Sequence, residues 1–348
     1  MDGYIMFKTP LFINWSLSTK CNFQCQHCYS RFEKCEELSK EDNKKIINIL
    51  AEIKIPFINF GGGEPLLIPE LFEITLYAYN KGLHVSMSSN GYLLDNKMAQ
   101  KIKEAGFSKV EISLDSHIQE IHDNFRNKKG SFNRVKRAVA ALKNAGVTVD
   151  ISTVICKINN QNFHKIVDFA RELGVRKISL HNFKCSGLGF CNRTELDLTP
   201  LEWKEFYEQA VKIKKISKDI IISLDDPIIS SLSEHPEFKE KTEAIVKGSI
   251  CGKLSLAIKS NGDITPCGFL PLVIGNMLKD DILEVWQKSP VLEAMRNKKP
   301  KDKCQNCNFY TDCVGGCTSR AYALTGDINA PDPHCWIIPH ESSDYKEG

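Results

Sequence analysis

Three cysteines near the amino terminus have a spacing that could hold an iron–sulfur cluster. Cys21, Cys25 and Cys28 stand in the segment C-N-F-Q-C-Q-H-C-Y. No fourth cysteine completes the usual zinc or ferredoxin pattern, so three thiolates could bind three irons of a [4Fe–4S] cluster and leave the fourth iron open. An open position is where a metal site can act chemically. Taken alone, the same residues also fit a partial zinc site or free thiols.

A second group of cysteines lies near the carboxyl terminus. The chain has 14 cysteines in 348 residues, and its first residues show no secretion signal, so we expect metal binding rather than disulfides. Spacing by itself does not separate zinc from iron. The second group consists of Cys251, Cys267, Cys304, Cys307, Cys313, Cys317 and Cys335.

Strands and helices must alternate to position the first cysteines. Glycines end several predicted helices directly before the next strand, as left-handed caps do. Six strands alternating with helices imply a parallel sheet, and six units are too few to close an eight-stranded barrel. We therefore predict an α/β fold, an open partial (β/α)6 TIM-like barrel with its ligand at the carboxyl ends of the strands. The predicted strands are Ile13–Ser18, Pro56–Phe60, Leu83–Ser89, Lys109–Leu114, Val147–Ile155 and Lys177–His181.

The character of the chain changes after residue 225. We predict the partial barrel over residues 1–225, a mostly helical bridge over 226–250, and a small α+β, cysteine-rich iron–sulfur domain over 251–348. In this last part, Asn261-Gly262 is a strong hairpin signal between two short strands, Leu254–Ile258 and Asp263–Pro266.

Glycines and polar residues follow the predicted strands. The second strand runs into G-G-G-E-P at residues 61–65, and glycines there let the backbone approach a ligand closely. The third and fourth strands end near Ser88 and Asn90 and near Ser113 and Asp115. These side chains could reach a ligand at the mouth of the barrel, although each position is also compatible with an ordinary turn or strand end.

Together these motifs resemble the radical S-adenosylmethionine (radical SAM) enzymes. In that family the three thiolates hold a [4Fe–4S] cluster whose free iron binds SAM, and an electron splits the sulfonium to give a 5′-deoxyadenosyl radical. The later cysteines resemble the SPASM domain, which carries auxiliary clusters. The resemblance runs from about residue 11 to residue 336. It implies three [4Fe–4S] clusters, one binding SAM and two auxiliary, with SAM as the further cofactor.

The resemblance also implies an interleaved set of ligands for the auxiliary clusters. One cluster would be held by Cys304, Cys307, Cys313 and Cys335. The other would be held by Cys251, Cys267 and Cys317. Because this second set has three cysteines, its fourth iron is either open to substrate or bound by Cys185, Cys191 or a ligand other than cysteine.

The same resemblance implies a set of contacts to SAM. The Gly-Gly-Glu segment would bind the methionine amino group, with the Glu64 carboxylate as an added contact, and Arg126 would clamp the SAM carboxylate. A surface ion pair is the plain alternative for Arg126. His27 either packs against adenine or only shapes its loop, and no residue is assigned as a catalytic acid or base. The predicted cofactor-binding residues are Gly61, Gly62, Gly63, Glu64, Ser88, Asn90, Ser113, Asp115 and Arg126.

As a function, the resemblance implies a radical SAM oxidoreductase or maturase that modifies a peptide or protein by crosslinking, epimerisation or oxidation. The alternative is modification of a tetrapyrrole side chain in the biosynthesis of haem or a related cofactor. An alternative of another class is a zinc-binding module without catalysis. Gly268 stands where sulfatase maturases usually have an aspartate, which speaks against that subgroup. The first predicted strand begins near residue 13, so we expect no leader-peptide-binding domain before the barrel.

Charge and composition limit the partners. The net charge is only +3, and the longest apolar runs are of strand length, so we expect no nucleic-acid partner and no membrane. The expected partners are a peptide or small cofactor-precursor substrate and an electron donor such as flavodoxin or ferredoxin. Oxygen-sensitive clusters and the lack of a secretion signal favour a cytoplasmic location.

Overall fold

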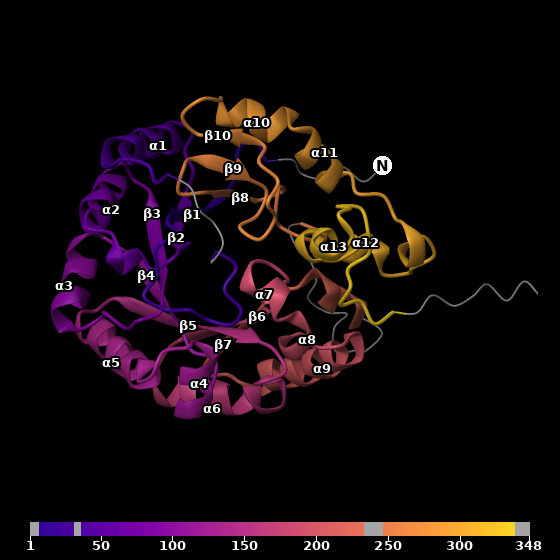
Figure 1. Ribbon diagram of the computed structural model, residues 1–348, viewed down its shortest axis with the longest axis horizontal. Helices are drawn as coiled ribbons and strands as arrows, with labels where there is room; N and C mark the ends of the chain where they lie inside the picture. Colours follow the sequence, from indigo (N-terminus) through magenta and orange to yellow (C-terminus); the bar gives the residue numbers. More distant parts are fainter. Residues whose placement is uncertain (1–6, 31–35, 233–245, 338–348) are drawn as a thin grey trace, which may run out of the picture.

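The strands of the computed structural model, which describes residues 7–30, 36–232 and 246–337, form one continuous sheet. Their order is β10-β9-β8-β1-β2-β3-β4-β5-β6-β7. From β8 through β1 to β7 the neighbours are parallel, whereas β9 and β10 pair antiparallel at one edge. Because the sheet begins at β10 and ends at β7, the curved sheet does not close among the described residues (Figure 1). The predicted α/β partial barrel is confirmed.

The first six strands lie within two residues of their predicted bounds at each end. The hairpin around Asn261-Gly262 is also present, as β8 and β9. The strands are β1 Phe12–Ser18, β2 Phe57–Gly62, β3 His84–Ser89, β4 Lys109–Ser113, β5 Thr148–Ile155, β6 Lys177–Asn182, β7 Ile221–Leu224, β8 Ser255–Ile258, β9 Asp263–Thr265 and β10 Gly275–Asn276.

Two features of the sheet differ from the expectation. The short apolar run that forms β7 pairs with β6 and adds a seventh parallel strand, which the sequence analysis did not predict. Strand β8 pairs with β1, so the hairpin of the predicted iron–sulfur domain extends the sheet of the barrel. The proposed division at residues 226–250 stays a prediction, because residues 233–245 lie outside the described part of the chain.

Helices surround the outer face of the curved sheet, as Figure 1 shows. Ser39 caps the amino terminus of α1, since its hydroxyl accepts from the Asp42 amide at 3.1 Å. No helix within the described ranges is both long and apolar enough to span a bilayer. The helices are α1 Lys40–Glu52, α2 Leu71–Asn80, α3 Asn96–Glu104, α4 Gln119–Phe125, α5 Ser131–Asn144, α6 Phe163–Glu172, α7 Leu188–Cys191, α8 Arg193–Leu196, α9 Pro200–Ile216, α10 Ile282–Lys288, α11 Pro290–Arg296, α12 Tyr310–Cys313 and α13 Thr318–Thr325, with 3₁₀ turns η1 Pro65–Leu67, η2 Asn160–Asn162, η3 Pro227–Leu232 and η4 Asp302–Cys304.

The two faces of the sheet differ in polarity because side chains alternate along each strand. Ile58, Phe60 and Met87 are fully buried in the core beneath the helices. The alternate positions carry polar side chains, and they stay in register from strand to strand, as in the pair Asn59 and Ser86. The inner face of the barrel is therefore polar, which leaves it available for a ligand rather than for packing.

Candidate functional site

The loop after β1 brings Cys21, Cys25 and Cys28 together beyond the carboxyl end of the strand. The Cys28 amide donates to the Cys25 carbonyl at 3.2 Å, so the loop turns back on itself between these two residues. Cys21 and Cys28 both influence the ionisation of Cys25, as expected for thiols that lie close together. All three are free thiols. This grouping is what three ligands of one cluster require.

Burial controls the protonation of these thiols. It raises the pKa of Cys25 to about 12 and also raises the pKa of Cys21. The guanidinium of Arg126 acts in the opposite direction, and its Nη1 donates to Cys25 Sγ at 3.8 Å. The ligating form of cysteine is the thiolate, and a bound metal deprotonates a coordinating thiol.

Arg126 forms a buried ion pair with Asp115 rather than the surface pair considered above. Its Nε donates to Asp115 Oδ2 at 2.5 Å, and the two side chains are 9% and 1% exposed. Burial alone would raise the pKa of Asp115, but the Arg126 guanidinium holds it below its usual value. The second oxygen of Asp115 accepts from the Val154 amide, so the pair is fixed to β5.

His122 completes this arrangement as a neutral side chain. Its Nδ1 accepts from the Asp115 amide at 3.2 Å, which requires an unprotonated nitrogen. Burial lowers the pKa of His122 to about 4. The segment His122-Asp123-x-x-Arg126 therefore has one local role that the structure describes: it holds Arg126 and Asp115 beside the cysteine loop.

Gly62 and Gly63 lie directly against the loop that follows β1. The Gly63 amide donates to the Ser18 carbonyl at 2.7 Å. A Cβ at Gly63 would lie 2.0 Å from the Lys20 carbonyl oxygen, and one at Gly62, where φ is +95°, would lie 2.6 Å from the Ser18 carbonyl oxygen. Gly61 has only ordinary contacts around it. Two of the three glycines thus anchor the cysteine loop, a role that the sequence analysis did not assign.

The Glu64 carboxylate is engaged by protein groups. It accepts from the Ser89 hydroxyl and the Asn90 amide, both at 2.8 Å, and from the Leu66 amide at 3.2 Å. The residue is only 2% exposed, and burial raises its pKa. Glu64 therefore joins the end of β2 to the end of β3, and its predicted contact with SAM stays a prediction.

The remaining predicted SAM contacts, Ser88, Asn90 and Ser113, have different neighbours. The side-chain Nδ2 of Asn90 donates to Asn22 Oδ1 at 2.8 Å and lies 4.0 Å from Cys21 Sγ. The Asn90 side chain therefore belongs to the surroundings of the cysteine loop. Ser88 accepts from Asn59 on the inner face of the sheet. Ser113 is half-buried at the end of β4, in register with Ser152 of β5.

His27 lies within the cysteine loop, between Cys25 and Cys28. Its ring stacks on Phe125 with centroids 4.4 Å apart. Burial, reinforced by Arg126, lowers the pKa of His27 to about 3, so the imidazole is neutral. Its buried Nδ1 has no hydrogen-bond partner among the described residues. Buried polar atoms are normally paired, so this one marks a place for a polar group of a ligand.

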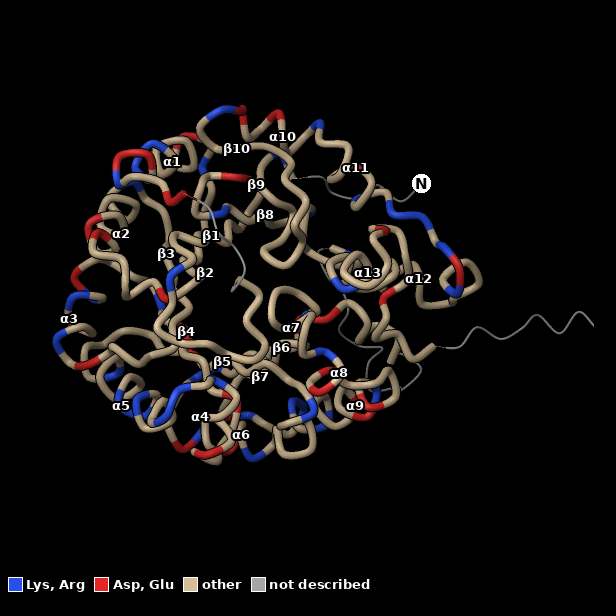
Figure 2. Tube along the Cα trace, in the orientation of Figure 1, with Lys and Arg blue, Asp and Glu red and all other residues tan. Residues whose placement is uncertain are grey.

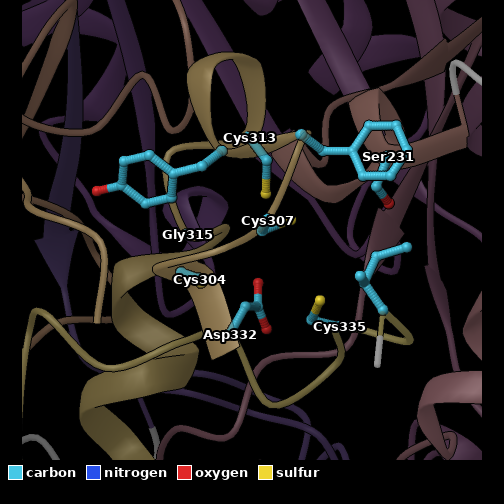
Figure 3. A pocket seen from close by; sticks show the side chains of 10 residues that line it. Ser231, Cys304, Cys307, Cys313, Gly315, Asp332 and Cys335 are labelled. Carbon is cyan, nitrogen blue, oxygen red and sulfur yellow. The ribbon is translucent and has the colours of Figure 1, made fainter. Parts of the chain in front are cut away.

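Four of the later cysteines line one cavity, which Figure 3 shows from close by. The space between these side chains, including the part that opens to solvent, is about 310 Å³. Asp332 and Gly315 complete part of the wall. Burial raises the pKa of the Cys304 thiol to about 11. The cysteines around the cavity are Cys304, Cys307, Cys313 and Cys335.

The other three cysteines of this region interact with one another. Cys251 and Cys267 share a hydrogen bond, which lowers the pKa of Cys251 and raises that of Cys267. Cys317 adds to the rise for Cys267. The seven cysteines thus fall into a group of four and a group of three. Their roles as cluster ligands stay predictions.

Lys184 is a neighbour of the three-cysteine group that the sequence analysis missed. Its Nζ donates to Cys317 Sγ at 3.4 Å and lies 5.9 Å from the ring of Phe269. That ring contacts Tyr29, which directly follows Cys28, with centroids 4.8 Å apart. These side chains link the two cysteine regions. No local sequence signal marks Lys184, because 133 positions separate it from Cys317.

Cys185 and Cys191, the other candidate ligands of this group, differ in burial. The Cys185 thiol is buried and donates to Asp197 Oδ2 at 3.5 Å. Cys191 is exposed at the end of α7. Across residues 7–30, 36–232 and 246–337, no three His, Cys, Asp or Glu side chains converge as ligands of a single metal ion would.

Two family models match the chain. One, described as the radical SAM superfamily, matches residues 15–173, and the SPASM model, an iron-sulfur cluster-binding domain, matches residues 251–308. An AdoMet-dependent heme synthase of Methanosarcina barkeri is 31% identical, over 96% of this chain and 98% of that protein. The Fe-coproporphyrin III synthase of the same organism is 28% identical, over 97% and 90%. Mycofactocin maturase MftC of Mycolicibacterium smegmatis is also 28% identical, over 97% and 89%.

Solved structures share the fold at low sequence identity. Streptococcus suis SuiB bound to S-adenosylmethionine superposes with a TM-score of 0.78 and 18% identity, over 96% of this chain and 79% of that one. Native anSMEcpe with bound AdoMet gives a TM-score of 0.74 and 19% identity, over 94% of both chains. These likenesses concern the arrangement of the backbone.

Proposed function

The chain belongs to the radical SAM superfamily and carries a SPASM domain, and from this membership we propose that it cleaves SAM reductively and abstracts a hydrogen atom from an organic substrate. The observation that carries the proposal is the grouping of Cys21, Cys25 and Cys28 beside Arg126 at the mouth of the barrel. Three ligands leave one iron of a [4Fe–4S] cluster open. When bound, such a cluster supplies the electron that splits SAM into methionine and a 5′-deoxyadenosyl radical.

The residues around the cysteine loop suit SAM. Arg126 uses Nε for Asp115 and Nη1 for Cys25, and within the described residues its Nη2 has no partner. That edge of the guanidinium is available for the SAM carboxylate. The unpaired His27 Nδ1 offers a second polar contact. Gly61, Gly62, Gly63, Glu64, Ser88, Asn90, Ser113 and Asp115 complete the proposed surroundings of SAM.

We propose that the two later cysteine groups hold auxiliary clusters. The cavity lined by four cysteines supports one complete ligand set, Cys304, Cys307, Cys313 and Cys335. The other set, Cys251, Cys267 and Cys317, has three thiols. The Cys185 thiol, one candidate for the fourth ligand, donates to Asp197 Oδ2. The position left open there, close to Lys184, suits a substrate group.

For the substrate, a tetrapyrrole is the candidate that the relatives favour. The 31% identical relative is a heme synthase, and a further one acts, by its name, in the synthesis of Fe-coproporphyrin III. One cationic side chain of the barrel, Lys184, suits a carboxylate group of such a substrate. A peptide substrate, modified by crosslinking, epimerisation or oxidation, is the second candidate. It is supported by the similarity to mycofactocin maturase.

The first experiment tests the chemistry. Protein reconstituted anaerobically with iron and sulfide is mixed with SAM and dithionite, and 5′-deoxyadenosine is measured. Wild type forms it, whereas Cys25→Ala forms none and loses about a third of its iron, the share of one cluster in three. The control Cys156→Ala changes a fully buried core cysteine and keeps both properties. A protein that carries zinc without iron or sulfide, and forms no 5′-deoxyadenosine, would instead be a non-catalytic zinc module.

A second experiment separates the two substrate classes. Fe-coproporphyrin III and a short precursor peptide are each incubated with the active enzyme. The expected result is a mass change of the tetrapyrrole that appears together with 5′-deoxyadenosine. A mass change of the peptide alone would favour the second candidate.

A further inference from the structure

The segment that follows His122 and Asp123 is strongly basic. Residues 124–149 contain seven Lys or Arg and no Asp or Glu, although the net charge of the whole chain is only +3. Figure 2 shows this charge along the connection from α4 to α5. We define the basic face as the five cations of this connection and the first half of α5: Lys128, Lys129, Arg134, Lys136 and Arg137.

These charges are not neutralised by neighbouring carboxylates. Among the described residues, no Asp or Glu lies within ion-pair distance of any member of the basic face. Elsewhere on the surface, lysines such as Lys44 of α1 do form ion pairs. Asp123 is adjacent in sequence, but its carboxylate is used by the amides of Gly130 and Phe132 and by the Ser131 hydroxyl. The basic face therefore presents net positive charge to the solvent.

The basic face lies next to the cysteine loop. Two of these cations lie over the ring of Tyr92. Lys128 Nζ is 4.9 Å from the ring centroid, and Arg134 Cζ is 5.1 Å from it. Tyr92 also contacts Phe23, with ring centroids 5.6 Å apart, and the Phe23 amide donates to Cys21 Sγ at 3.4 Å. Two aromatic side chains thus separate the cations from a proposed cluster ligand.

A second contact fixes the loop to the same connection. The Gln26 amide donates to the Phe125 carbonyl at 3.1 Å, and its side chain donates to the Asn124 carbonyl at 3.0 Å. Because both acceptors end α4, the cysteine loop and the start of the basic face are held as one unit. A molecule bound to the basic face would therefore lie close to the loop.

We propose that the basic face docks a small acidic redox protein, which delivers one electron at the cysteine loop. This inference rests on the proposed function, since SAM cleavage consumes one electron from a reductant. The donor is oxidised by one electron, and the cluster held by Cys21, Cys25 and Cys28 is reduced by one. Complexes of this kind are small and transient, and complementary charge serves to accelerate their encounter. Unpaired cations beside the site of reduction suit that purpose.

The test measures reduction separately from SAM cleavage. Fully reduced flavodoxin with an acidic surface is mixed anaerobically with the reconstituted protein, and bleaching of the cluster absorbance gives a second-order rate constant. Lys128→Glu/Lys129→Glu/Arg134→Glu lowers this constant by about tenfold or more at low salt. For wild type, raising the ionic strength to about 1 M lowers it as well, because screening removes the attraction.

A matched control places the same change of charge elsewhere. Lys212→Glu/Lys214→Glu/Lys218→Glu alters three exposed lysines on and just after the carboxyl-terminal end of α9, and it leaves the rate constant unchanged. With dithionite, a small reductant that needs no docking face, all three proteins form 5′-deoxyadenosine at the same rate. The dithionite measurement separates SAM cleavage from docking of the redox protein. If no 5′-deoxyadenosine forms with dithionite, the proposed function is contradicted, but the docking inference is not.

The docking inference is overturned if the basic-face variant accepts electrons from flavodoxin as fast as wild type. A wild-type rate that does not respond to salt overturns it too. A labelled RNA duplex that binds wild type but not this variant, together with an unchanged flavodoxin rate, would assign the face to nucleic acid instead.

Discussion

Arg320 of α13 and Asp226, which follows β7, form a bidentate ion pair whose side chains are 0% and 1% exposed. Arg320 Nη1 and Nη2 donate to the two carboxylate oxygens at 2.8 and 2.9 Å. The same guanidinium binds Asp332, whose carboxylate also accepts from the Cys317 amide. One buried arginine therefore joins the last strand of the barrel to the segments that carry Cys317 and Cys335.

Arg320→Met is expected to lower the free energy of unfolding by about 3–5 kcal/mol, because it leaves two buried carboxylates without their partner. Urea denaturation of the anaerobic protein measures the change. The control is Lys288→Met, which removes an exposed pair with Glu284 on α10 and should not alter the midpoint. Equal midpoints for Arg320→Met and wild type would mean that the ion pair does not stabilise the joined parts.

Arg126→Gln is expected to weaken SAM binding by about tenfold or more, since a hydrogen bond between charged groups contributes about 1.5–3 kcal/mol. Anaerobic calorimetric titration with SAM measures the affinity, and an iron assay shows that the cluster is retained. Arg171→Gln serves as control, because Arg171 pairs with Asp168 and Asp219 at the surface. Unchanged SAM affinity in Arg126→Gln would remove Arg126 from the proposed SAM contacts.

Gly63→Ala is expected to lower the free energy of unfolding by about 1–3 kcal/mol, as other overpacked sites do. The added Cβ would meet the Lys20 carbonyl oxygen at 2.0 Å, and backbone must move to admit it. The neighbouring change Gly61→Ala meets nothing closer than 3.8 Å and should leave the unfolding midpoint in place. If the two variants unfold at the same urea concentration, the close approach of the cysteine loop is not what requires glycine.

Stability should depend on pH through His181 and Asp225, which lie 3.1 Å apart at the carboxyl ends of β6 and β7. Burial alone would lower the pKa of His181, but Asp225, helped by Glu111, raises it from 6.5 to about 9. The pKa of His181 is higher in the folded protein than in the unfolded chain. The contribution of the pair to stability is therefore complete below about pH 6.5 and is lost as the pH rises through about 9.

His181→Gln therefore destabilises the protein at pH 6 and has little effect above pH 9. We expect a loss of about 1 kcal/mol or less, because the two side chains are 35% and 57% exposed and water screens the pair. Urea unfolding of wild type and variant at both pH values measures it. A difference that stays constant across this range would show that the imidazolium does not contribute.

Most of the fold and the grouping of the cysteines could be predicted from short segments of the sequence. Apolar runs and helix-ending glycines predict the first six strands, because each pattern lies within one element. The spacing of Cys21, Cys25 and Cys28 is equally local, since a single loop brings them together. Strand β7 was not predicted, because its four residues are too few to show a clear pattern of apolar side chains.

Only the tertiary structure decided how distant segments serve the site. It paired β8 with β1, placed Lys184 beside Cys317, and turned Gly63 and Glu64 into anchors of neighbouring loops. The basic residues after Asp123 are plain in the sequence, yet their place beside the cysteine loop follows from the contacts of Tyr92 and Gln26. Composition and spacing fix which groups a chain possesses. Which of them meet depends on packing between residues far apart in sequence, and no local pattern encodes that packing.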